Sequence, residues 1–354
     1  MKKGVLITFV SILLLAGMLV IGDVKPATAA PPQTIELRFA HFLPPVSVRH
    51  KAEFVPWAKM IEERTGGKVK ITIYPAGSLL KQHEIYDGVI NNIAQIGFAD
   101  IEQAWGRFPR TEVITLPMAP WDESIRTANH TIYRLFERGY LADDYKEVKM
   151  LGLIVASPQV LSSTKKPIRT LEDLKGMKIA VGQKGISAAL EKMGATCANV
   201  LAKDHYMALQ KGTVDANVFS WFGMAIFRLL EVTKYHMDSG LGVGPLGVVM
   251  NQQTWDSLPA DVKSVIDGVS GEWYSKFDAD LQKGINEGMV KKAQDMPGHE
   301  VIHLSAEERA RWVAVCKEIW DEYASDVEAK GVPGKKILGA ALEITGEFTN
   351  WSLK

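Results

Sequence analysis

Residues 169–181, R-T-L-E-D-L-K-G-M-K-I-A-V, say more about this chain than any other stretch of similar length. A short loop leads into an acidic turn and a Lys-Gly step, and Lys178 to Val181 then form a β-rich run. Such a run after a polar turn predicts a strand that enters a sheet. Position 180, near the end of this strand, is occupied by alanine.

Strands and helices alternate on both sides of this segment. Upstream, hydrophobic periodicity predicts strands at 35–42, 69–74 and 94–99 and helices at 49–64 and 84–93. Around and after it, the same criterion predicts strands at 151–155, 159–163, 178–181, 214–218 and 240–251 and helices at 186–193, 204–211 and 224–230. This alternation is typical of an α/β fold with parallel strands joined by crossover helices.

The length of 354 residues exceeds what one core comfortably organises, so we expect two domains. Their expected limits are 30–155 for lobe I, 156–244 for lobe II and 245–258 for the return of the chain to lobe I. Residues 259–296 predict a long amphipathic helix, bent at its glycines, and residues 297–354 predict C-terminal helices. Ser305 and Glu308 form a capping box for a helix over 305–329.

The first 29 residues read as an export signal. Lys2 and Lys3 precede an apolar run, and small residues follow at 26–30, so we expect cleavage after Ala29 and a periplasmic protein, with an uncleaved anchor as the alternative. Cleavage would remove three lysines and one aspartate from 41 basic and 41 acidic residues, which leaves a net charge near −2. That balance argues against a nucleic-acid surface, which needs clustered excess Lys and Arg.

The two cysteines, Cys197 and Cys316, are far apart in the sequence and carry no disulfide-framework signature. An exported protein permits a disulfide, but the simpler expectation is two unrelated buried thiols. We expect no cofactor, because the eight histidines lack metal-ligand spacing. No G-x-S-x-G, P-loop or H-E-x-x-H motif is present, so we do not expect an enzyme.

Five segments in order resemble one protein family. They are L-R-F-A-H-F-L-P-P at 37–45, E-E-R-T-G-G-K-V-K-I-T-I-Y-P-A-G-S-L at 62–79, residues 169–181, A-L-Q-K-G-T-V-D-A at 208–216 and N-Q-Q-T-W-D-S-L-P-A-D-V at 251–262. The family is that of the extracytoplasmic solute receptors of TRAP transporters, of the dicarboxylate-receptor type. The resemblance implies a type II-like periplasmic binding fold, with two lobes, a hinge, and a long helix crossing both lobes. It also implies a solute cleft that closes by hinge motion and delivery to membrane subunits driven by an ion gradient.

Three positions depart from that family. The resemblance places its carboxylate-clamp arginine at Ala180, a second basic position at Gln159 and an asparagine near Phe219. An arginine at the clamp position would bind a carboxylate through two parallel hydrogen bonds, which alanine cannot make. The chain therefore resembles an atypical branch whose solute chemistry differs from the usual one.

Candidate solute contacts lie at the predicted strand ends, where open α/β sheets bind ligands. Phe219, Trp221 and Phe222 form either a platform for an aromatic, apolar or ammonium-bearing solute, or part of the lobe core. Gln183 and Lys184 precede a helix start that offers N–H groups to an anion; the alternative is a solvated loop. His41 either bonds the solute or is a satisfied buried histidine, and Asp100, like Glu102, either faces a cationic solute or caps a turn.

The sequence thus favours a receptor for one small organic solute, with no nucleic-acid partner. An organic acid, with an aromatic or apolar tail, is the leading class; an amine or alcohol is the alternative. A ligand-presenting partner of a sensory histidine kinase is a further alternative to transport. We expect the receptor to act as a monomer.

Overall fold

The computed structural model describes residues 34–354, apart from positions 103, 105, 350 and 354. The predicted export signal, residues 1–29, lies outside the described residues. Among the residues that are described, no helix is both long enough and apolar enough to cross a membrane.

A five-stranded sheet forms the centre of lobe I, with the strand order β2-β1-β3-β10-β4. β1 pairs in parallel with β2 and β3, whereas β10 is antiparallel to β3 and β4. The strands are β1 (Ile35–Ala40), β2 (Val69–Tyr74), β3 (Ile96–Asp100), β4 (Val148–Val155) and β10 (Pro245–Asn251). The parallel part follows from the early alternation of strands and helices, because parallel neighbours need a crossover connection.

The crossovers of lobe I are η1 (His50–Phe54) with α1 (Val55–Arg64), and α2 (Ile85–Ile90). The sequence predicted one helix over 49–64; the structure has a π-helical turn, η1, that leads directly into α1. Trp57 and Ile61 share the buried face of α1 and pack against Phe39 of β1, as their helical spacing predicts.

A six-stranded sheet forms the centre of lobe II, with the strand order β11-β9-β5-β8-β6-β7. β6 is parallel to β7 and β8, and β5 is antiparallel to β8 and β9. The strands are β5 (Gln159–Ser163), β6 (Lys178–Ala180), β7 (Thr196–Ala198), β8 (Ala216–Ser220), β9 (Tyr235–Met237) and β11 (Glu300–Ile302). Its helices include α4 (Lys184–Lys192), α5 (His205–Gln210) and α6 (Trp221–Ile226).

Two extended segments connect the sheets and bond to each other. Residues 156–158 lead from β4 to β5, and residues 240–244 lead into β10. Ala156 N–H donates to Gly244 O at 2.7 Å, and Gln159 N–H donates to Gly242 O at 2.8 Å. The strand predicted over 240–251 therefore begins only at Pro245, because its first residues form this connection between the lobes.

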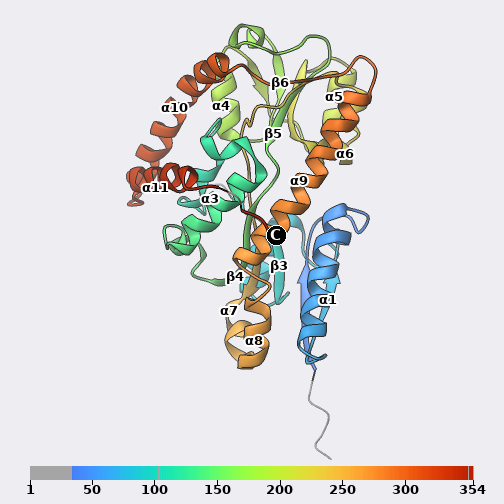
Figure 1. The fold of residues 1–354 in the computed structure, drawn as a ribbon, viewed down its shortest axis with the longest axis vertical. Helices are drawn as coiled ribbons and strands as arrows, with labels where there is room; N and C mark the ends of the chain where they lie inside the picture. The colour runs from blue at the N-terminus through green and yellow to red at the C-terminus, as the bar shows by residue number, and fades with distance from the viewer. Residues whose placement is uncertain (1–33, 103, 105, 350, 354) are drawn as a thin grey trace, which may run out of the picture. The chain divides into compact units, whose positions relative to one another are not determined.

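A long helix is the third element that contacts both lobes. α9 (Glu272–Asp295) contacts β4 in lobe I and α6 in lobe II, and Figure 1 shows it in orange between them. The predicted bend is a complete break, because α8 (Ala260–Asp267) ends before Gly271, whose φ is +56°. The Gly271 N–H donates to Leu151 O at 2.6 Å, so this turn is tied to β4.

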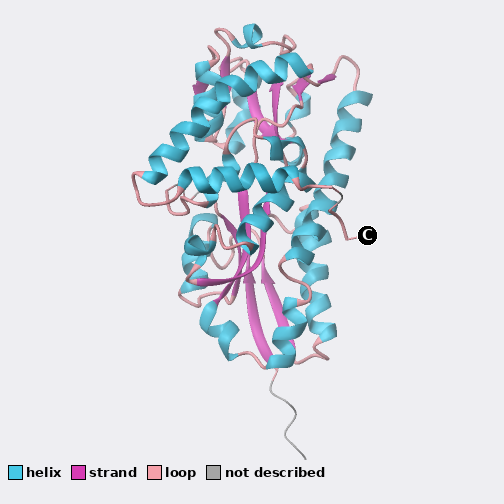
Figure 2. Cartoon of the chain, turned by 60° about the vertical axis from the view of Figure 1, so that its left-hand side comes forward, coloured by secondary structure: helices cyan, strands magenta, loops and turns pink. Residues whose placement is uncertain are grey.

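Three further helices are α3 (Ile125–Glu137), α10 (Ala306–Glu328) and α11 (Gly334–Gly346). They form a chain of contacts in which α3 packs on α9, α11 packs on α3 and α10 packs on α11. Figure 2 shows helices surrounding both groups of strands. Ser305 caps α10 by accepting the Glu308 N–H at 3.2 Å. The predicted capping box is wrong in its second hydrogen bond, because the Glu308 side chain does not accept the Ser305 N–H. The Glu308 carboxylate instead accepts N–H groups of Leu171 and Trp312.

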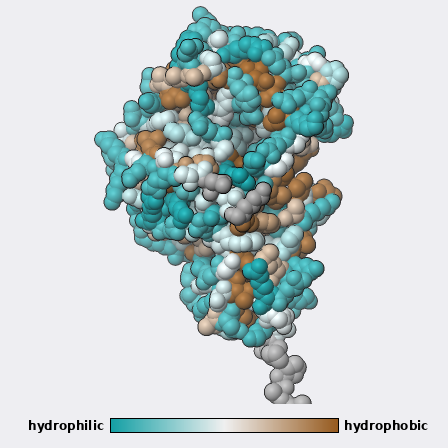
Figure 3. All heavy atoms as spheres, in the orientation of Figure 1, coloured by the Kyte–Doolittle hydropathy of each residue, from teal (hydrophilic) through white to brown (hydrophobic). Residues whose placement is uncertain are grey.

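Apolar packing divides into three buried clusters, and tryptophans are the largest fully buried side chains, among them Trp57, Trp121, Trp221 and Trp312. Figure 3 shows one face that is mostly hydrophilic, with apolar residues gathered in separate patches. Cys197 and Cys316 are both free thiols, which confirms that they are unrelated, but only Cys316 is buried, whereas Cys197 is half-buried.

Candidate functional site

The candidate site comprises the strand ends at which the two sheets approach the boundary between the lobes. In open α/β sheets, ligands bind beyond the carboxyl ends of parallel strands. In lobe I these ends carry His41, after β1, and Asp100, at the end of β3. In lobe II, β5 starts at Gln159, and the chain after β6 and β8 continues to Gln183 and Trp221.

Glu102 connects the two lobes at this boundary. Its backbone N–H donates to Pro245 O at 3.2 Å, and the side chain of Gln183, the residue before α4, lies near its carboxyl group. Gly244 makes room for that carboxyl group, because a Cβ at this glycine would lie 2.1 Å from Glu102 Oε2. Glu102 thus contacts both lobe II and a connecting segment.

The surroundings of Glu102 favour its neutral form. Burial, and next the charge of Asp100, raise the pKa of Glu102 to about 8, against the lowering effect of the nearby Gln183 side chain. The Oε1 atom is shielded from solvent and finds no hydrogen-bond partner among the described residues. A buried polar atom in that state is costly unless a ligand or water satisfies it.

Asp100, Gln183 and Lys184 lie around Glu102. Asp100 accepts a hydrogen bond from Gln82 Nε2 at 2.5 Å. Gln183 is half-buried, and Lys184 is an exposed residue at the start of α4. Burial raises the pKa of Glu112 nearby, and the positive charge of Lys184 counteracts part of that rise. Three of the predicted contacts are thus brought to the same stretch of the boundary.

His41 lies inside lobe I. It is fully buried, with its ring 4.8 Å from that of Phe54, and its Nε2 is 2.8 Å from Nδ1 of His50. Burial, and next the charge that His50 can carry, lower the pKa of His41 to about 4. The imidazole is therefore neutral at physiological pH and already has a histidine partner.

Trp221 is the first residue of α6 rather than the end of a strand. The Ser220 side chain caps this helix by accepting the Gly223 N–H at 3.2 Å, which explains why the helix begins earlier than the predicted 224. Trp221 is only 2% exposed, and its Nε1–H donates to Asp238 Oδ2 at 3.0 Å. Its ring lines a cavity of about 560 Å³ that also touches Pro158.

Phe219 and Phe222 are half-buried. The Phe219 ring meets His205 edge-on at 5.1 Å and Phe227 at 5.5 Å. Gly223 permits this position, because a Cβ there would lie 2.1 Å from the Phe219 ring. Phe219 therefore combines packing within lobe II with partial exposure.

The positions that resemble the family's carboxylate clamp carry no cation. Ala180 is fully buried in an apolar cluster with Val160 and Met224. Its register partner, Asn217, is also fully buried, and neither polar atom of its amide has a hydrogen-bond partner among the described residues. Gln159 is buried, with its Nε2 3.4 Å from Ser157 O.

Trp221→Phe is expected to lower the free energy of unfolding by about 1–3 kcal/mol, because it leaves the half-buried Asp238 carboxyl without its donor. Urea denaturation measures this loss. Trp273→Phe is the control, since this half-buried ring stacks on Phe277 and should cost less than about 1 kcal/mol. Equal losses in the two variants would contradict the assigned role of the Trp221–Asp238 hydrogen bond.

Comparisons with known proteins agree with this geometry. The family model described as bacterial extracellular solute-binding protein, family 7, matches residues 39–326. A C4-dicarboxylate-binding periplasmic protein of Rhodobacter capsulatus is 24% identical over 332 residues, covering 88% of this chain and 92% of that protein.

Solved structures show the same fold. A marine metagenome TRAP solute-binding protein specific for aromatic acid ligands, in complex with 3-hydroxybenzoate, is similar at 26% identity and a TM-score of 0.81, over 90% of this chain and 100% of that one. A TRAP periplasmic solute-binding protein of Desulfovibrio salexigens is similar at 26% identity and a TM-score of 0.81, over 89% and 98%. The chain therefore belongs to the bacterial extracellular solute-binding proteins of family 7, the solute receptors of TRAP transporters.

Proposed function

We propose that this receptor captures a small organic acid with an aromatic or otherwise apolar tail and delivers it to the membrane subunits of a TRAP transporter. It is exported by residues 1–29, acts in the periplasm as a monomer and does not turn its solute over. The choice of solute depends on Ala180, which stands where the family resemblance places an arginine and is fully buried in an apolar cluster.

In this proposal the acid group of the solute lies near the start of α4, where backbone N–H groups and Lys184 favour an anion. The tail lies against the accessible edges of the lobe II aromatics. The proposed contacts are Trp221, Phe219, Phe222, Gln159, Gln183, Lys184, His41 and Asp100. The aromatic-acid ligands of the metagenome receptor support this solute class.

A thermal-shift comparison of the mature protein tests the proposal. We expect 3-hydroxybenzoate to raise Tm and succinate to have no effect, because a dicarboxylate depends more than a monocarboxylate on the cations that positions 159 and 180 lack. At a ligand concentration about 100 times Kd, the stabilisation is about 2.7 kcal/mol, which raises the Tm of a chain of this length by roughly 4 °C.

Benzylamine, which has a similar ring and the opposite charge, is the matched control. A shift with succinate alone would overturn the aromatic-acid assignment. A shift with benzylamine alone would favour the amine alternative, for which Asp100 and Glu102 provide adjacent carboxyl groups at the boundary.

A further inference from the structure

Glu102 combines three features that its packing role in lobe I does not explain. Its carboxyl group lies near Gln183 of the other lobe and packs against Gly244 of a connecting segment. Its Oε1 atom has no hydrogen-bond partner within the described part of the chain. A carboxyl group placed for packing alone would be expected to satisfy both oxygens. The free oxygen lies where the lobes meet, at the end of β3.

We infer that Glu102 is a specificity-determining residue of the solute site: its carboxyl group lies beside Gln183, and the free oxygen makes a hydrogen bond to the acid group of the solute. This inference rests on the proposed function, since it assumes that the solute is an organic acid. Glu102 would thus bind a carboxylate, whereas the sequence suggested only a cationic solute or a turn cap for this residue.

The neutral form of Glu102 is the form that can make this contact. A protonated carboxyl group donates one hydrogen bond, whereas a carboxylate only accepts and would repel the solute. Burial and the charge of Asp100 raise the pKa of Glu102 to about 8, so the proton is retained at neutral pH. The protonated carboxyl group of Glu102 thus donates one of the hydrogen bonds that an arginine would donate to the solute.

Three other charged groups face this region from neighbouring elements. Asp100 lies at the end of β3, and Lys184 follows Gln183 at the start of α4. Glu112 of η3 (Thr111–Thr115) lines a small hollow together with Glu102. Asp100 raises the pKa of Glu102, so removal of its charge must lower that pKa.

Calorimetric titration with 3-hydroxybenzoate at pH 6 and pH 9 tests the inference, because the carboxylate of the probe stays ionised throughout. We expect the affinity of the native protein to fall about tenfold between pH 6 and pH 9, as the protonated fraction of Glu102 falls to about one tenth. Glu102→Gln keeps a donor and should show an affinity within about threefold of the native value at pH 6, with a flat pH profile. Glu102→Ala should bind at least tenfold more weakly at pH 6.

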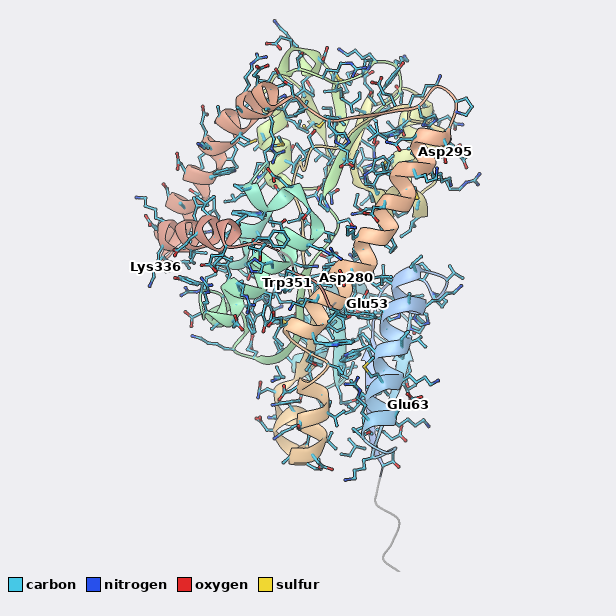
Figure 4. The ribbon with its side chains drawn as sticks, in the orientation of Figure 1. Glu53, Glu63, Asp280, Asp295, Lys336 and Trp351 are labelled. Carbon is cyan, nitrogen blue, oxygen red and sulfur yellow. The ribbon has the colours of Figure 1, made fainter. Side chains whose placement is uncertain are left out.

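Two further variants sharpen the result. Asp100→Asn should keep the pH dependence but move its midpoint to lower pH. Glu63→Gln removes an exposed carboxylate on α1, marked in Figure 4, and should change nothing. If Glu102→Ala fails to fold, the profiles of the native protein and Glu102→Gln still decide the question.

Glu102→Gln binding as weakly as Glu102→Ala would overturn the inference, since Glu102 would then act as an acceptor. Native-like affinity in both variants would assign it a packing role only. No binding of 3-hydroxybenzoate by the native protein at either pH would instead contradict the proposed function, so the two failures are distinguishable.

Discussion

Arg49→Met is expected to lower the free energy of unfolding by about 3–5 kcal/mol, because it leaves two buried carboxyl groups without their cation. Arg49 Nη1 lies 2.7 Å from Asp278 Oδ1 and 3.2 Å from Glu53 Oε2, and all three side chains are at most 4% exposed. The guanidinium also lies 5.2 Å from the centre of the Phe98 ring. Methionine would fill part of the space but provide none of these contacts.

The same cluster ties η1 to α9 and to α3. Tyr274 donates to Glu53 Oε1 at 2.6 Å, and Asn129 Nδ2 donates to Asp278 Oδ2 at 2.9 Å. Figure 4 shows Glu53 beside the part of α9 that carries Asp280. Since α9 contacts both lobes, the loss of Arg49 weakens the packing of the helix that connects them.

The loss is expected to grow with pH. Burial raises the pKa of Glu53 to about 8 and also raises the pKa of Asp278, whereas Arg49 lowers both. A carboxyl group with a raised folded-state pKa is fully tolerated below its unfolded-state pKa, and stability is lost as pH rises toward the folded-state pKa. Because the unfolded-state pKa is the same in both proteins, the variant should lose extra stability, relative to the native protein, as pH rises above the native folded-state pKa, which is about 8 for Glu53.

Urea denaturation at pH 5 and pH 9 measures both effects. Arg126→Met is the matched control, because Arg126 pairs with Asp280 on α9 while both side chains are about one quarter exposed. We expect this control to lose no more than about 1 kcal/mol at either pH. If both variants lost the same amount, burial would not be the reason for the importance of Arg49.

Much of the fold could be predicted because local patterns and the final packing agree. The alternation at 69–74 became β2 with the predicted limits, and the apolar spacing of α1 became its buried face. Within the helical region after Pro259, Gly271 was among the glycines expected to bend the chain; its positive φ ends one helix and begins another. These features depend on neighbours in sequence, which is why periodicity reveals them.

Side-chain pairs between distant segments were beyond the reach of that reasoning. Arg49 and Glu53 have the i, i+4 spacing of a helical ion pair, but no local signal indicates that Asp278 joins them. The approach of Gln183 to Glu102 depends on how the end of β3 and the start of α4 come together in the fold. The aromatic run 219–222 was predicted to follow the end of a strand, and only the folded position of Ser220 shows that its hydroxyl caps a helix that begins at Trp221.

Gly240→Ala is expected to destabilise the protein by about 3 kcal/mol or more. Gly240 has a φ of +65°, a conformation that costs an L-residue about 1–2 kcal/mol. A Cβ at this position would also lie 2.3 Å from the carbonyl oxygen of Asp122, and such overpacking adds about 1–3 kcal/mol to the cost. Asp122 is fully buried and accepts the Ala119 N–H at 3.0 Å, so its backbone cannot move away without disturbing η4 (Pro120–Glu123).

Gly298→Ala separates the two contributions. Gly298 also has a positive φ, +77°, but no atom lies within 4 Å of the position that a Cβ would take there, so this variant should lose only the conformational part, about 1–2 kcal/mol. Chemical denaturation of both variants gives the difference, which reports the contact between Gly240 and Asp122. Since Gly240 begins the segment that returns to lobe I, its close approach to Asp122 fixes where the connection between the lobes starts. Equal losses in the two variants would show that this close approach does not contribute to the stability.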